Sequence, residues 1–379
     1  MRPPERESYS REKHRRVMDV SFHQKKGVVM KALTVIPHQA GSAQLSEVDE
    51  SPISDGPLLV ETLAVGICGT DIEILSGAYG WAPPGRERLI LGHESIGRVL
   101  EAPAGGAFSP GDLVVGIVRR PDPVPCGNCA VLEWDFCRNG LYTERGIKEH
   151  DGYLSERYRI TPDFAVKVDP ALSTLGVLLE PTSVVAKAWE DVERIGGRAS
   201  WSPTTALITG AGPIGLLAAL IGVQRGLDVH VLDQMSDGVK PDLVRSLGAT
   251  YHSGSVTGSG LCPDIIIECT GVSSLVLDAM TNIGNGGVVC LTGVSSGGHT
   301  IQVDEGALNR SMVLQNVAVV GSVNANRRHY EKAAQVLAAA DRDWLAKLVS
   351  RRVPLEKWHE ALQRQPDDVK VVVEVGAGE

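Results

Sequence analysis

A glycine-rich turn between two apolar runs limits the possible folds of this chain more than any other feature. The run Thr205–Thr209 leads into Gly210-Ala211-Gly212-Pro213-Ile214-Gly215, and the stretch 216–224 that follows is almost entirely apolar. A strand that enters a helix through such a turn leaves free amides and a partial positive charge where phosphates bind. The spacing is typical of a βαβ unit that binds a dinucleotide. Five residues are assigned to this cofactor site: Gly210, Gly212, Pro213, Ile214 and Gly215.

Asp233 ends the next apolar run and bears on the choice of dinucleotide. A carboxylate at this position accepts hydrogen bonds from both ribose hydroxyls and repels a 2′-phosphate. Residues 234–238 contain no arginine, and Lys240 is the first cation that follows. The sequence therefore favours NAD over NADP; the alternative is an aspartate that only ends a strand.

The rest of the chain divides into two regions that differ in their pattern of apolar runs. After Glu180, strand-like and helix-like runs alternate, which predicts an α/β region with a Rossmann-type doubly wound parallel sheet over residues 184–323. Residues 31–170 instead show short apolar runs punctuated by Gly and Pro, with few helical periods, which predicts an antiparallel β-barrel. The tail reads as a helix over 329–340, a helix-like segment opening at 353 and a closing strand over 369–375.

The expected domains are a catalytic barrel over 30–183 and 324–379, and a nucleotide-binding domain over 184–323. Residues 1–29 are rich in charge and lack the apolar centre of a signal peptide, so they are predicted to be a disordered extension.

Two short segments in the barrel region point to a metal. Cys68 lies in Gly66-Ile67-Cys68-Gly69-Thr70-Asp71, and 25 residues later comes Gly92-His93-Glu94. Thiolate, imidazole and carboxylate are zinc ligands, and a catalytic zinc leaves one position open. Glu180 follows an apolar run, where an unpaired carboxylate is costly to bury. The predicted catalytic zinc site is Cys68, His93 and Glu180, with Glu94 either a ligand or a neighbour that exchanges with water.

Composition excludes several classes of protein. The 379 residues suggest two domains, and a net charge of −9 gives no basic footprint for nucleic acid. No apolar run is long enough to span a membrane. The seven cysteines are an odd number, and Cys126, Cys129 and Cys137 lie close together. This pattern indicates metal or thiol chemistry in a reducing, cytoplasmic compartment.

With these motifs in place, the chain resembles the zinc-containing medium-chain dehydrogenases/reductases, and within them the glucose 1-dehydrogenase group of sugar dehydrogenases. Further segments that carry the resemblance are Leu89–Glu94, Val118–Pro121, Glu144–Ile147, Asp151–Tyr153 and Glu180–Ser183. The resemblance implies a GroES-like barrel beside the Rossmann domain, hydride transfer between a polyol and NAD, and a homodimer or homotetramer.

The resemblance also implies residue roles. Thr70 is expected to pass the substrate proton outward, or only to close its turn. Glu73 stands where related alcohol dehydrogenases commonly have histidine, and it either relays protons or braces the turn. Glu144, Glu180 and Asn324 are expected to contact the substrate, with Asn324 also near the nicotinamide.

Two departures from the family pattern matter. A structural zinc in this family uses four cysteines, and the first position falls here on Pro123. Asp122 could substitute, the lobe zinc could be lost, or the three thiols could carry no metal. Some glucose dehydrogenases have an aspartate where this chain has Val184, so a deoxysugar, amino sugar or cyclitol fits as well as glucose. The remaining alternatives are an amino-alcohol or simple alcohol dehydrogenase, and a nucleotide-binding protein without turnover.

Overall fold

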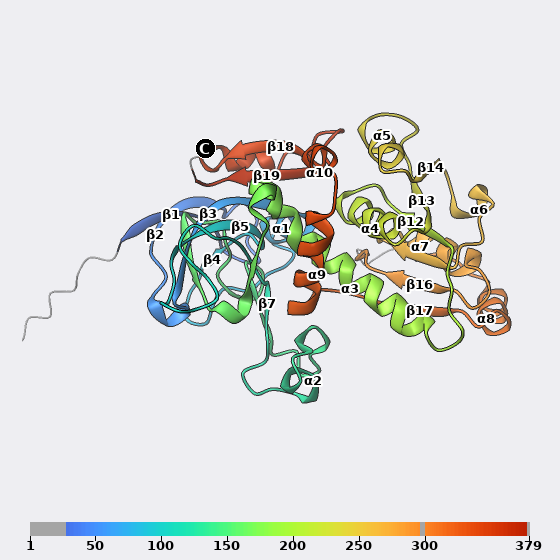
Figure 1. The fold of residues 1–379 in the computed structure, drawn as a ribbon, viewed down its shortest axis with the longest axis horizontal. Helices are drawn as coiled ribbons and strands as arrows, with labels where there is room; N and C mark the ends of the chain where they lie inside the picture. Colours follow the sequence, from blue (N-terminus) through green and yellow to red (C-terminus); the bar gives the residue numbers. More distant parts are fainter. Residues whose placement is uncertain (1–27, 296–299, 377–379) are drawn as a thin grey trace, which may run out of the picture.

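The computed structural model describes residues 28–295 and 300–376. In Figure 1 a β-rich half lies on the left, a parallel-sheet half lies on the right, and a small lobe that carries α2 extends away from both. The predicted extension 1–29 falls almost entirely outside the described residues. Strand β1 begins at Val29, one residue before the predicted start of the fold.

The first half is built on three sheets. The largest has seven strands in the order β11-β6-β5-β3-β19-β18, with β10 paired to β3; the others are β2-β1-β4 and β7-β8-β9. The strands are β1 (Val29–Val35), β2 (Gln44–Asp49), β3 (Leu58–Ile67), β4 (Leu89–Ile90), β5 (Glu94–Glu101), β6 (Leu113–Gly116), β7 (Arg119–Arg120), β8 (Thr143–Arg145), β9 (Glu149–His150), β10 (Arg157–Ile160), β11 (Ala165–Lys167), β18 (Val349–Pro354) and β19 (Lys370–Glu374).

Two expectations for this half need correction. Most strand pairs are antiparallel as predicted, but β8–β9 and β18–β19 are parallel. Val353 and Pro354 belong to strand β18, because they pair with β19, and the helical turns begin only after them. The helical segments of this half are α1 (Gly69–Leu75), α2 (Gly127–Ala130), α9 (Arg327–Ala338), α10 (Arg342–Leu348), α11 (Trp358–Ala361), η1 (Ile53–Asp55), η2 (Trp134–Phe136), η3 (Pro162–Phe164), η4 (Pro170–Leu178) and η5 (Leu355–Lys357).

The second half contains one six-stranded sheet, in which every paired strand runs parallel, in the order β14-β13-β12-β15-β16-β17. The order reverses at β12, so the crevice at the carboxyl end of β12 is the expected ligand site of such a sheet. Its strands and helices are β12 (Thr205–Thr209), α4 (Pro213–Gln224), β13 (Asp228–Asp233), α5 (Val239–Ser246), β14 (Thr250–Ser253), α6 (Val256–Ser259), β15 (Ile265–Glu268), α7 (Ser273–Asn282), β16 (Val288–Leu291), α8 (Glu305–Leu314) and β17 (Ala318–Gly321). This confirms the predicted α/β architecture.

Helix α3 (Leu179–Gly196) joins the two halves (Figure 1). Its buried Trp189 donates a hydrogen bond from Nε1 to Ala218 O of α4, at 3.1 Å. The largest apolar cluster includes barrel residues such as Ile96 together with sheet residues such as Val231, so one core runs through both halves. The predicted domain boundary at 183/184 falls within α3 and stays a prediction.

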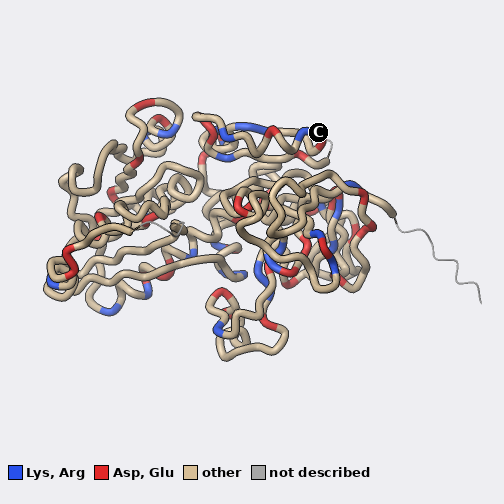
Figure 2. Tube along the Cα trace, turned by 180° about the vertical axis from the view of Figure 1, so that it is seen from behind, with Lys and Arg blue, Asp and Glu red and all other residues tan. Residues whose placement is uncertain are grey.

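Charged residues of both signs are distributed along the chain in both halves (Figure 2). Within the described residues, no helix has the length and apolar character needed to cross a membrane.

Candidate active site

Cys68 lies at the junction of β3 and α1. It is the N-cap of α1: its Sγ accepts a hydrogen bond from Thr70 N at 3.3 Å. In return, Asp71 Oδ2 accepts one from Cys68 N at 2.9 Å. This reciprocal capping satisfies amides that a helix start leaves free and fixes the direction of the sulfur.

His93 faces Cys68 from the start of β5. Its Nε2 lies 3.1 Å from Cys68 Sγ, and its Nδ1 lies 3.4 Å from Asp71 Oδ1. Gly92 permits this approach, since it has φ +89° and a Cβ there would collide with Val65 and Leu154. The structure therefore brings together two of the predicted zinc ligands, Cys68 and His93, and groups Asp71 with them, whereas Glu94 and Glu180 do not belong to this cluster.

The electrostatics of this cluster suit a cation. Burial acts to lower the pKa of His93, but the adjacent Cys68 sulfur and Asp71 carboxylate raise it well above its usual value. A thiol and an imidazole, with the ring's second nitrogen turned to a carboxylate, form a typical donor set for zinc. The residues present thus fit the catalytic metal that was predicted.

Glu180 belongs to the same neighbourhood. It lies in the first turn of α3, is 8% exposed, and has no hydrogen-bond partner for its carboxylate among the described residues. Burial raises its pKa to about 7; nearby Glu94 adds to that rise, whereas His93 opposes it. A buried carboxylate left without a partner is a reasonable third ligand.

Glu94 is held by a cation that the sequence analysis missed. Lys370 Nζ, on β19, lies 2.7 Å from Glu94 Oε1 and 2.6 Å from Oε2, and both side chains are almost fully buried. Gly66 lies opposite Glu94 in the sheet, and a Cβ there would collide with the Glu94 carboxylate. The one lysine within the apolar strand predicted over 369–375 was the available signal.

Thr70 and Glu73 both lie on α1. Thr70 is half-buried beside the Cys68 sulfur, whereas the Glu73 side chain is exposed. Their proposed parts in proton transfer stay predictions.

Glu144 and Asn324 meet although 180 positions separate them. Asn324 Nδ2 donates to Glu144 Oε1 at 2.7 Å. Glu144 comes from β8, and Asn324 lies on the segment between β17 and α9 with φ +63°, a left-handed conformation. Two of the residues predicted to contact the substrate thus form one polar unit.

The glycine turn has the expected geometry. Gly210 has φ +89°, Gly212 is the N-cap of α4, and Pro213 is its first residue. A Cβ on Gly215 would overlap Gly210 O, so only glycine allows this close packing. Asp233 Oδ2 accepts a hydrogen bond from Ala211 N at 2.6 Å, which ties the end of β13 to the turn.

The cysteine lobe lies on the excursion between β7 and β8 (Figure 1). The sulfurs of Cys126, Cys129 and Cys137 lie within 4.8 Å of one another. Asp122 does not join them: its carboxylate accepts from Val124 N at 2.8 Å and Asn139 Nδ2 at 2.7 Å. Among the described residues this cluster offers three ligands, so the donor set of a four-ligand structural zinc is incomplete.

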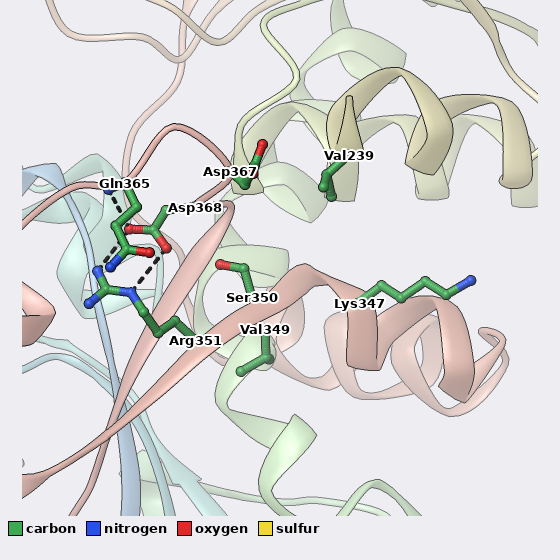
Figure 3. Close-up of a pocket in the computed structure, with 8 residues that line it drawn as sticks. All are labelled: Val239, Lys347, Val349, Ser350, Arg351, Gln365, Asp367 and Asp368. Atoms are coloured by element: carbon green, nitrogen blue, oxygen red, sulfur yellow. Dashed lines mark hydrogen bonds and ion pairs between the residues drawn. The ribbon is translucent and has the colours of Figure 1, made fainter. Parts of the chain in front are cut away.

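A separate surface cavity of about 340 Å³ lies between α5, α10 and β18 (Figure 3). Arg351 and Asp368 line it and pair with each other at 2.8 Å. None of the predicted site residues lines it.

Comparisons with known proteins agree with this geometry. Residues 54–170 match the alcohol dehydrogenase GroES-like domain, and residues 173–375 match the glucose dehydrogenase C-terminus. The chain is 39% identical to a glucose 1-dehydrogenase of Methanocella arvoryzae over 92% of this chain and all of that one. A glucose 1-dehydrogenase of Caldivirga maquilingensis is also 39% identical, over 91% of this chain and 99% of the relative.

A solved structure adds chemical detail. Glucose dehydrogenase of Haloferax mediterranei, in complex with NADP, Zn and gluconolactone, superposes with a TM-score of 0.83 at 31% identity. The match covers 92% of this chain and 100% of that one. The chain therefore belongs to the zinc-containing medium-chain dehydrogenases/reductases, in their glucose dehydrogenase group, as a zinc-dependent, NAD(P)-linked sugar or alcohol dehydrogenase.

Proposed function

We propose that this enzyme oxidises one hydroxyl group of a glucose-like sugar, deoxysugar, amino sugar or cyclitol, with NAD as the hydride acceptor. The observation that carries the proposal is the approach of Cys68 Sγ to His93 Nε2, 3.1 Å apart, with the buried Glu180 carboxylate nearby. The glucose dehydrogenase relatives support the sugar as substrate class.

The chain's own residues hold the reacting groups in place. Cys68, His93 and Glu180 would hold the metal, and Asp71, 3.4 Å from Nδ1, would orient the His93 ring. A bound zinc supplies a Lewis acid for the alcohol oxygen, and the bound dinucleotide supplies the hydride acceptor. The Thr70 hydroxyl accepts the substrate proton and passes it outward, with Glu73 beside it on α1.

Glu94 has a different place in this scheme. Lys370 holds both of its carboxylate oxygens, so Glu94 acts here as a buried charge behind Cys68 and His93. For Glu94 to serve as a metal ligand, this ion pair would have to open.

Glu144 and Asn324 bind hydroxyl groups of the substrate. Their direct contact, at 2.7 Å, supports a shared role in holding the substrate. Val184 is half-buried on α3 and offers no hydrogen bond where some relatives have aspartate. A substrate with one hydroxyl fewer than glucose, or with that hydroxyl differently placed, is therefore included.

The preference for NAD rests on Asp233. Its carboxylate lies at the glycine turn and would repel a 2′-phosphate. The Haloferax mediterranei structure contains NADP, which weighs against this preference. The variant Asp233→Ser tests it: we expect the ratio of kcat/KM for NAD to that for NADP to fall by roughly 10- to 100-fold, as hydrogen bonds to a charged group are lost.

A substrate screen tests the whole proposal. Aldoses, deoxysugars, amino sugars and cyclitols are assayed with NAD and with NADP, on protein whose zinc content per chain has been measured. We expect NADH formation with at least one sugar or cyclitol. Turnover of threonine or simple alcohols alone would overturn the substrate class, and a higher kcat/KM with NADP would overturn the cofactor preference.

A further inference from the structure

Arg119 and Glu144 form a buried pair at the base of the cysteine lobe. They lie directly opposite each other in the register of β7 and β8, and they are 5% and 6% exposed. Arg119 Nε and Nη2 both lie 3.0 Å from the same oxygen, Glu144 Oε1. The pair is thus formed between neighbouring strands that carry the chain into and out of the lobe.

The two oxygens of the Glu144 carboxylate have unlike surroundings. Oε1 accepts hydrogen bonds from Arg119 Nε at 3.0 Å and from Asn324 Nδ2 at 2.7 Å, and Arg119 Nη2 lies within ion-pair distance of it at 3.0 Å. Oε2 has no hydrogen-bond partner among the described residues, and the Glu144 side chain keeps 8% of its surface exposed. One oxygen therefore fixes the carboxylate, and the other stays available as an acceptor.

Arg119 is itself fixed from two further directions. Its Nη1 donates to the backbone oxygen of Asp135 at 3.1 Å, and the Tyr142 ring lies over the guanidinium at 3.7 Å. The Asp135 carboxylate accepts from Asn326 Nδ2 at 2.8 Å, two residues after Asn324. Arg119 thus contacts Glu144, the backbone of Asp135 and the Tyr142 ring at the same time, which requires the planar guanidinium with its several donors.

We propose that Arg119 is a positioning residue for substrate recognition: it holds Glu144 so that Oε2 accepts a hydrogen bond from a substrate hydroxyl. This inference rests on the proposed function, in which Glu144 binds the sugar. Without Arg119 the carboxylate loses its counter-charge and its fixed rotamer, so binding the hydroxyl must order it first. The effect falls on sugar affinity and leaves the metal ligands and the glycine turn unchanged.

The test uses the zinc-loaded enzyme and the variants Arg119→Met, Arg119→Lys, Glu144→Gln and Arg119→Met/Glu144→Gln. Arg138→Met, an exposed site in the lobe, is the matched control for loss of one positive charge. We expect Arg119→Met to raise KM for the sugar roughly 10- to 100-fold, with KM for the dinucleotide within twofold of the unmodified enzyme. Arg119→Lys keeps the positive charge but lacks the planar set of guanidinium donors, so it should restore less than a tenth of the sugar affinity that Arg119→Met loses.

The double variant separates positioning from a general structural role. If Arg119 acts through Glu144, Arg119→Met adds no more than twofold to the sugar KM of Glu144→Gln. A second readout, independent of turnover, is the rise in Tm that the best sugar of the screen gives to each zinc-loaded protein; we expect Arg119→Met to lose it.

Clear outcomes overturn the inference. The inference is wrong if Arg119→Met leaves the KM for the sugar unchanged. It is also wrong if Arg119→Met raises that KM by the same factor in the Glu144→Gln variant as in the unmodified enzyme. If Arg119→Met does not fold, as judged by its Tm without sugar, Arg119→Lys takes its place in the test. An unaltered KM for the sugar in Arg119→Lys would refute positioning by the Arg119 guanidinium. Failure of the proposed function is distinct, because the unmodified enzyme would then oxidise no sugar at all.

Discussion

At the scale of single residues, the metal cluster depends on one thiol that also begins a helix. We expect Cys68→Ser to lower zinc content below half an ion per chain and to lower kcat by about 10³-fold, since a Lewis acid contributes several kcal/mol to such a reaction. Metal analysis and steady-state kinetics check this. Cys262→Ser, at an exposed cysteine of the other half, is the matched control and should leave both values unchanged.

Lys370 gives a second residue-scale prediction, this time for stability. Removing one partner of a buried ion pair leaves an uncompensated charge, so Lys370→Met should lower the free energy of unfolding by about 3–5 kcal/mol. Urea denaturation of the metal-free protein measures it. Adding Glu94→Gln should recover part of the loss, and Lys31→Met, at an exposed pair with Glu356, should cause no measurable change. Equal losses for the two lysine variants would contradict the assignment.

Some residues of the site could be predicted from local sequence, whereas others depend on the tertiary structure. Cys68, His93 and the glycine turn were predictable because each lies in a glycine-flanked segment whose spacing is set by its chemistry. Asp71 was in view as part of the Cys68 segment, three residues on, but nothing local showed that its second oxygen would face His93. Lys370 and Arg119 were not predictable as partners, because their roles depend on strands that meet only in the folded sheet.

At the scale of elements, the parallel sheet was the easiest part to predict. Its inner strands β12, β15 and β16 are buried on both faces, so they appear as short, continuous apolar runs, whereas the edge strands β14 and β17 are at most partly buried and were not predicted. Helix α1 was missed because it has seven residues and only two buried ones, too few for a helical period; a capping box at Cys68 and Asp71 begins it. Val353 and Pro354 were taken for the opening of a helical segment because their pairing with β19 leaves no local mark, whereas the helical turns expected after them are present at 355–361.

Strand β17 and helix α8 carry a prediction about assembly. β17 is the last strand of its sheet, and α8 beside it has no buried residue, with Val313 and Leu314 64% and 68% exposed. An open strand edge next to exposed apolar side chains is a typical interaction surface. We expect the enzyme to be a homodimer or homotetramer in solution, and Val313→Lys/Leu314→Lys to raise its dissociation constant at least tenfold.

Light scattering after size exclusion measures this assembly. Val124→Lys, at an exposed apolar residue of the lobe, is the control and should leave the mass unchanged. A monomeric unmodified protein, or assembly unaffected by the two lysines, would show that this surface has another role.

At the scale of the whole molecule, the first half is closed by the end of the chain. β19 lies between β3 and β18, and Lys370 on it contacts Ile67, 303 positions away. A chain shortened to residues 1–364 lacks β19 and Lys370. We expect it to lose zinc and to become sensitive to protease within the barrel, as seen by mass spectrometry of the fragments, because its core loses Val371 and Val373. Retained zinc and an intact barrel would be contrary to this.

The division into a barrel region and a parallel-sheet region was visible in the sequence, but the way in which the two regions pack together was not. Periodicity reports which face of an element is buried, and it is silent on the element that covers it. Helix α3 illustrates the difference: its apolar period was evident, whereas its role in carrying Glu180 at one end and packing Trp189 on α4 depends on the assembled fold.

The late position of β19 has a consequence for biosynthesis. A ribosome has made all six strands of the parallel sheet when it reaches Gly321, whereas the strand that closes the barrel, Lys370–Glu374, is made only afterwards. Since domains fold as their chain becomes available, the nucleotide-binding half precedes the metal-binding half, the reverse of their order in the sequence. The nascent chain therefore displays Cys68 and the open edge of β3 until β19 has been made, and we expect stable capture of the metal only after that point.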